Sequence, residues 1–71
     1  MTTKSLADYD RAIQLNPNYA DAYNNRGNLK STLDDKQSAI QDYQKAADLY
    51  KQGNTLMYQF AVDNVKKLSE Q

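Results

Sequence analysis

An eleven-residue pattern occurs twice in this chain of 71 residues, and the second occurrence begins 34 residues after the first. Residues 5–15 align with residues 39–49 without a gap, and the alignment gives four identical pairs. These pairs are Asp8 with Asp42, Tyr9 with Tyr43, Ala12 with Ala46, and Leu15 with Leu49. Internal periods of about 20 to 50 residues are typical of repeat architectures, in which each unit buries its apolar face against its neighbours. The chain is therefore expected to be a short stack of similar units with a thin core.

Each unit is expected to be a pair of helices. Apolar residues recur three and four positions apart along four consecutive segments, and no segment shows the alternation of a strand. The residues at this spacing on the first three segments are, in chain order, Leu6, Tyr9, Ala12 and Ile13; Tyr19 and Tyr23 with the adjoining stripe Ala22, Arg26, Leu29 and Leu33; and Ile40, Tyr43, Ala46, Ala47 and Tyr50. On the fourth segment, Met57, Phe60, Ala61, Val65 and Leu68 are expected to face the interior. We therefore predict an all-α fold of four helices joined by short turns.

A few residues with distinctive backbone preferences mark the turns. Asn16 precedes the only proline, and a residue before proline avoids helical geometry, so the first helix is expected to end near Leu15. Asn18 and Asp35 are expected to cap the second and third helices, because their side chains accept hydrogen bonds from free backbone N–H groups. Gly53 is expected to end the third helix in left-handed geometry.

A helix–turn–helix unit of 34 residues resembles the tetratricopeptide repeat, and individual residues are similar to that family as well. Tyr23 stands where the family favours a large aromatic residue, and Gly27 stands at its small helix-crossing position. On the following helix, Ala39, Tyr43 and Ala46 match the family's small–aromatic–small set. The resemblance implies antiparallel helix pairs in a right-handed α-solenoid.

The resemblance also implies how the chain is organised. Residues 1–17 would be the second helix of a partial repeat, residues 20–53 a complete repeat, and residues 54–70 a C-terminal capping helix, all within a single domain. Arg26 and Lys30 stand where the family has leucine and an aromatic residue, so we expect their alkyl stems to pack while their charged heads reach solvent. The family implies a protein or peptide partner and no cofactor.

Composition and charge exclude several classes of site. The sequence has no cysteine and no histidine, so it lacks thiolate ligands, the commonest metal ligand and the commonest general base. Nine Lys and Arg balance nine Asp and Glu without a basic stripe, which argues against a nucleic-acid partner. No apolar run approaches the roughly 20 residues that span a bilayer, and no secretory signal is recognised, so we expect no membrane association and a cytoplasmic location.

The carboxylates have structural explanations. Asp34 and Asp35 stand at a helix start, where acidic residues usually cap the helix and interact with its dipole. Asp8, Asp10 and Asp42 are expected on solvent-exposed faces, and they lack the spacing of a metal-binding loop. We therefore predict no catalytic residues, no metal site and no enzymatic activity.

The polar face of the second helix is the best candidate for a binding site. Asp21, Asn24 and Asn28 share one helical face, and Asn25 lies beside them. The asparagine amide both donates and accepts hydrogen bonds, so it suits the backbone of a bound peptide. In the resembled family this face lines a concave groove that holds extended peptides.

The 34-residue offset carries the same face to the fourth helix, where Tyr58, Val62 and Lys66 would continue the groove. The predicted peptide-binding residues are therefore Asp21, Asn24, Asn25, Asn28, Tyr58 and Lys66. An ordinary solvated face is the alternative interpretation of the same pattern.

The first helix offers a second candidate surface. Its apolar residues Leu6, Tyr9 and Ile13 can pack on the second helix from one side only. About three helical repeats are usually needed for stability, and the sequence carries the equivalent of two. The alternative function is therefore a structural unit that forms a homo-oligomer through this open edge. A marginal monomer and a piece of a longer array are the other interpretations.

Overall fold

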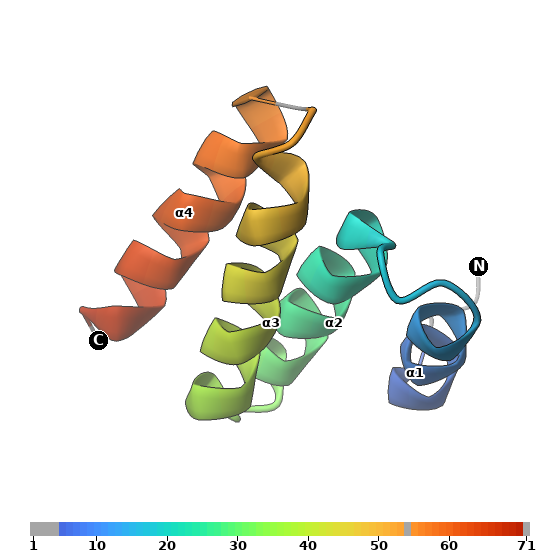
Figure 1. Cartoon of the computed structure of the whole chain (residues 1–71). Helices are drawn as coiled ribbons and strands as arrows, with labels where there is room; N and C mark the ends of the chain where they lie inside the picture. The colour runs from blue at the N-terminus through green and yellow to red at the C-terminus, as the bar shows by residue number, and fades with distance from the viewer. Residues whose placement is uncertain (1–4, 54, 71) are drawn as a thin grey trace.

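The computed structural model describes residues 5–53 and 55–70, and these residues form four helices. In chain order the helices are α1 (Leu6–Leu15), α2 (Ala20–Thr32), α3 (Lys36–Tyr50) and α4 (Thr55–Ser69). The part of the chain that the structure describes contains no strand, so the predicted all-α fold is confirmed. Figure 1 shows α3 between α2 and α4, each antiparallel to the next, with α1 on the outer side of α2.

The start of α1 is capped by side chains, whereas the start of α2 is not. Ser5 and Asp8 form a capping box, in which the backbone N–H of each residue donates to the side chain of the other at 3.3 Å. Asn18 does not cap α2, because Tyr19 takes the N-cap position and makes no side-chain cap hydrogen bond. The Asn18 N–H donates instead to Asn16 Oδ1 at 3.1 Å, which closes a turn before the helix.

Among residues 5–53 and 55–70, the left-handed backbone position is Asp34, not Gly53. Asp34 has a φ of 65°, whereas neither of the glycines, both within the described residues, has a positive φ. Aspartate tolerates this geometry because its short polar side chain can bond locally. The next residue, Asp35, occupies the N-cap of α3 as predicted but makes no side-chain cap hydrogen bond. The prediction for Gly53 is wrong, because α3 ends at Tyr50 and a hydrogen bond of 3.1 Å from the Gly53 N–H to the Tyr50 carbonyl closes the turn.

Small residues and tyrosines form a thin core between α2, α3 and α4. Most of its buried members lie in two clusters, which are Ala46, Ala47, Tyr50 and Ala61, and Ala39, Tyr43 and Leu68, and Ala22 of α2 is buried outside them. Where α2 crosses α3, a Cβ atom added at Gly27 would lie 2.9 Å from the ring of Tyr43. Because only glycine lacks this atom, Gly27 sets how closely the two helices approach.

A buried carboxylate joins α2 to α3. Asp42 is 4% exposed and accepts hydrogen bonds from Arg26 Nε at 2.9 Å and Arg26 Nη2 at 2.7 Å. Lys30 Nζ lies 3.1 Å from the same carboxylate, and Arg26 Nη1 lies 2.8 Å from Asp10 of α1. The bond with Asp42 is the main reason that the pKa of Arg26 is raised, while burial opposes the rise.

This ion cluster corrects two expectations. Asp42 does not face solvent, and the charged heads of Arg26 and Lys30 do not extend into it. The two cations stand where the family has apolar residues, so they lie at the helix interface, and a buried charge there requires an opposite charge. Asp42 provides that charge from the facing helix.

On α4, one residue expected in the interior is exposed. Phe60 is 57% exposed, whereas Met57, Ala61, Val65 and Leu68 lie at or against the buried clusters. Phe60 precedes Ala61 by one residue, which corresponds to about 100° around a helix. Once Ala61 is buried against α3, Phe60 is therefore turned away from the core.

Candidate functional site

A polar hollow of about 360 Å³ opens between α2 and α4. Its lining residues are Asn28, Ser31 and Thr32 of α2, Asn64, Lys67 and Leu68 of α4, and Tyr43 of α3. Since α2 and α4 each run antiparallel to α3, the walls of the hollow are two parallel helices (Figure 1). Among the lining residues that the structure describes, Lys67 is the one that carries a charge.

Some polar groups of the hollow are already used within the fold. The Tyr43 hydroxyl donates to Asn28 Oδ1 at 2.5 Å, which leaves the amide NH₂ of Asn28 as a donor. Burial raises the pKa of Tyr43, so the hydroxyl stays protonated near neutral pH and holds the Asn28 amide in this orientation. The Thr32 hydroxyl donates to the backbone carbonyl of Asn28 at 3.0 Å. Together with Asn64 and Lys67, the hollow thus offers several donors to a carbonyl or carboxylate group.

Of the four residues predicted on α2, this hollow contains Asn28 alone. Asp21 accepts a hydrogen bond from the hydroxyl of Tyr50, and the pKa of Tyr50 is raised by burial and by this bond. Asn24 is half-buried, and its Oδ1 is buried without a hydrogen-bond partner in the described part of the chain. Asn25 is exposed. Asp21 and Asn28 therefore also serve as acceptors for core tyrosines, which the sequence did not indicate.

The structure does not bring Tyr58 and Lys66 together with Asn28. They lie in another hollow, of about 480 Å³, between α3 and α4. The lining of this α3–α4 hollow comprises Gln44, Ala47 and Asp48 of α3 and Tyr58, Val62, Val65 and Lys66 of α4.

The 34-residue offset fails here because α4 is turned about its axis relative to α2. Gly27 packs on Tyr43 of the helix that follows it, whereas its equivalent, Ala61, packs on the helix that precedes it, beside Ala46 and Ala47. The face that carries Tyr58 is consequently directed away from α2. Equivalent positions in the sequence thus lie on different sides of the molecule.

Sequence reasoning missed Asn64 and Lys67 as lining residues. Both flank the buried stripe of α4 that contains Ala61 and Leu68. A helical wheel anchored on those two residues, instead of one transferred from α2, places Asn64 and Lys67 on one side of the buried stripe and Tyr58 and Lys66 on the other. The signal was therefore present in the sequence, but it required the correct orientation of α4.

The predicted edge of α1 is turned mainly toward α2. No residue of α1 is fully buried, and its half-buried residues are Leu6, Tyr9, Ala12 and Ile13. The helix that α1 contacts is α2, so this stripe lies at their interface. The opposite side of α1 exposes Asp8, Arg11 and Leu15, and Leu15 is 76% exposed.

Among residues 5–53 and 55–70, no group of three or more metal-ligating side chains comes close enough together to hold an ion. The same residues include no helix with the length and apolar character needed to cross a membrane.

Comparison with known proteins agrees with the helical repeat. A family model described as TPR repeat matches residues 2–33, and a model described as tetratricopeptide repeat matches residues 20–52. The search of curated proteins and the search of solved structures each gave no match. The two family matches overlap on α2 and together reach from α1 to the end of α3. The chain therefore belongs to the tetratricopeptide repeat family.

Proposed function

We propose that this chain is a protein–protein interaction module that binds an extended peptide segment in the hollow between α2 and α4. Tetratricopeptide repeats are generally modules for binding protein partners and are typically not catalytic. The observation that carries the proposal is a polar hollow between two parallel helices, with one cation and two amides in its lining.

The side chains of the hollow suit a peptide backbone. Asn28 and Asn64 stand on opposite walls, so their amides can bond the two edges of an extended strand. Lys67 adds a positive charge at one wall, which favours a segment that carries a carboxylate near this point. The hydrogen bond from Tyr43 holds the Asn28 amide in place, so less side-chain entropy is lost when a peptide binds.

A peptide selection with a matched pair of variants tests this proposal. A phage-displayed library of random peptides is selected on the immobilised chain, and the selected sequences are then titrated as free labelled peptides. We expect Asn64→Ala combined with Lys67→Ala to weaken binding by about tenfold or more, because both residues line the hollow. Lys45→Ala, on an exposed position of α3 outside both hollows, is the control and should bind as wild type.

Asn28 is left unchanged in this test because it accepts the Tyr43 hydrogen bond, so its removal would also disturb the fold. Circular dichroism at 222 nm checks that the variants remain helical. Equal binding by wild type and the double variant would show that peptides bind elsewhere, and failure to select any peptide would count against the module itself.

Self-association is the second candidate function. The observation that favours it is the state of α1, which has no fully buried residue and leaves Leu15 exposed. A helical repeat unit buries its apolar face against neighbouring units, so a helix that packs on one neighbour only gains burial when a further helix packs on it. A mass measurement over a range of concentrations tests this function, and a monomer at every concentration would exclude it.

A further inference from the structure

The hollow between α3 and α4 has the features of a binding site for a helix. Part of its lining is apolar, formed by Ala47 of α3 and by Val62 and Val65 of α4. Its two walls carry opposite charges, since Asp48 lies on α3 and Lys66 on α4. Both charged residues are exposed, and in the described part of the chain neither belongs to an ion pair. A helix that fits this hollow therefore needs an apolar residue, a negative charge that faces Lys66 and a positive charge that faces Asp48.

The exposed side of α1 has this combination. We define the α1 outer face as Asp8, Arg11 and Leu15, which stand three and seven residues apart and so share one side of the helix. All three residues are exposed, and Arg11 is in no ion pair with another described residue. Asp8 accepts the capping hydrogen bond from the Ser5 N–H through Oδ2, which leaves Oδ1 for another partner.

We propose that the α1 outer face of one copy docks into the α3–α4 hollow of a second copy, with α1 antiparallel to α4. This inference rests on the self-association described above and identifies the two surfaces that meet. In this arrangement Asp8 pairs with Lys66, and Arg11, one turn further on, pairs with Asp48 of the α3 wall. Leu15 then covers the apolar end of the hollow beside Tyr58.

The spacing along the two helices matches. Asp8 and Leu15 are seven residues apart, and Lys66 and Tyr58 are eight residues apart. At about 1.5 Å per residue, these separations correspond to roughly 10.5 Å and roughly 12 Å. An antiparallel α1 therefore places its charge and its apolar residue at the two ends of the hollow at the same time.

The fold already contains one pair of this type. The sequence of α1 repeats in α3, and α3 packs antiparallel on α2 (Figure 1). In that pair, Asp42 of α3 binds Lys30 and Arg26 of α2. Asp8 is the residue that corresponds to Asp42, so the proposed contact again pairs this aspartate with a lysine of the facing helix.

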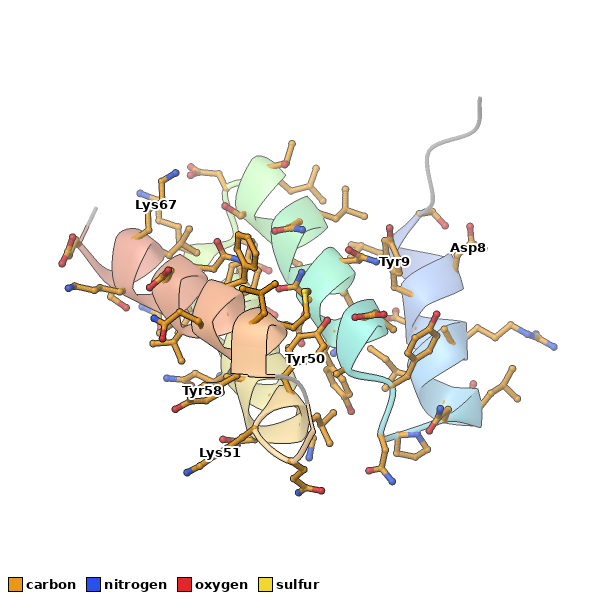
Figure 2. All side chains as sticks on the ribbon, turned by 90° about the horizontal axis from the view of Figure 1, so that it is seen from above. Asp8, Tyr9, Tyr50, Lys51, Tyr58 and Lys67 are labelled. Carbon is orange, nitrogen blue, oxygen red and sulfur yellow. The ribbon has the colours of Figure 1, made fainter. Side chains whose placement is uncertain are left out.

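One chain cannot fill its own hollow. Figure 2 shows Asp8 and Tyr58 on opposite sides of the molecule, with α2 and α3 between α1 and α4 in the order of the stack. The contact is therefore head-to-tail and uses two different surfaces, so it generates open chains or rings instead of a closed dimer. One helix in one groove is smaller than a standard interface, so we expect association only in the range of about 10 µM to 1 mM.

Two charge-reversal variants and their mixture test the proposal on the intact 71-residue chain. In the Asp8→Lys variant, two positive charges meet where position 8 of one copy faces Lys66 of the next. In the Lys66→Glu variant, two negative charges meet at the same contact. We therefore expect each variant alone to associate about tenfold more weakly than wild type. In an equal mixture the two variants alternate, and every contact then joins opposite charges. We expect the mixture to recover the association of wild type in sedimentation velocity across this concentration range.

The mixture distinguishes charge pairing from damage to the fold, because a misfolded variant cannot be rescued by a partner. Lys45→Glu makes the same charge change on α3 outside the hollow and should associate as wild type. A wild type that stays monomeric overturns both self-association and this contact. A wild type that associates while the variants and their mixture behave like it leaves self-association standing but overturns the head-to-tail contact.

Discussion

Asp42 is the residue at which a single change is expected to cost this small domain the most stability. Its carboxylate lies within 2.7 Å and 2.9 Å of two Arg26 nitrogens and 3.1 Å from Lys30 Nζ, and its side chain is 6% exposed. Replacement by alanine leaves two cations at the interface of α2 and α3 without their shared partner. The cost of breaking a buried ion pair from one side is about 3–5 kcal/mol.

The lower end of that range applies to Asp42→Ala. The side chains of Arg26 and Lys30 are 18% and 17% exposed to solvent, so water partly screens their charges. Both side chains also retain another contact when Asp42 is removed. Arg26 still pairs with Asp10, and Lys30 still donates to Ser38 Oγ at 2.7 Å. We therefore expect a loss of about 3 kcal/mol in the free energy of unfolding, or about 15 °C in Tm for a domain of this size.

Urea unfolding followed by circular dichroism at low temperature measures this loss. Asp10→Ala is the control, because it removes an exposed partner of the same arginine and should cost about 1 kcal/mol or less. Replacing the cluster together, as Asp42→Leu with Arg26→Met and Lys30→Met, should stay within about 1 kcal/mol of wild type, since no charge remains buried. If Asp42→Ala costs no more than Asp10→Ala, the buried carboxylate does not hold the helices as we infer.

Two further changes test the packing and the ionisation of the core. Gly27→Ala should destabilise the fold by about 1–2 kcal/mol in urea unfolding, because the new Cβ meets the Tyr43 ring at 2.9 Å and the Ala39 carbonyl at 3.3 Å. Gly53→Ala is the matched control, because its new Cβ would meet no atom within 4 Å and Gly53 has no positive φ. This control should instead stabilise the fold by about 0.4–1 kcal/mol, so an equal change in stability for both variants would contradict the close helix crossing at Gly27. The pKa of Tyr50 is raised in the folded state above its usual value of 10, so its contribution to stability is full below that pH and lost as pH rises above it. Wild type should therefore lose more free energy of unfolding than Tyr50→Phe between about pH 9 and about pH 11, and parallel losses would contradict a raised pKa for the buried Tyr50 hydroxyl.

The orientation of α4 shows where sequence reasoning succeeded and where it failed. The spacing of its apolar residues predicts the helix, and four of the five predicted interior residues are at or against the core. The same spacing did not show which of several apolar stripes would be buried. The prediction that Phe60 lies in the interior is therefore wrong, and Tyr58 and Lys66 line a different hollow from Asn28.

Polar partners were the second source of error. Asp42 has the residue type of a surface position, and its burial depends on two cations that lie 12 and 16 residues away in the sequence. The same holds for Asp21 and Asn28, which accept hydrogen bonds from tyrosines on the facing helix. The left-handed geometry predicted for Gly53 after α3 is found instead at Asp34, before the helix begins.

By itself, the sequence determined the four helices, their pairing and the family, because helical periodicity and the 34-residue repeat depend on residues near one another or at a fixed spacing. The tertiary structure alone decided which side of α4 meets α3, which charges are buried, and where the hollows open. Those outcomes depend on contacts between helices, in which the burial of one stripe excludes the others on the same helix. The position of Lys67 between α2 and α4, and of Lys66 between α3 and α4, therefore follows from how α4 is turned, not from either residue alone.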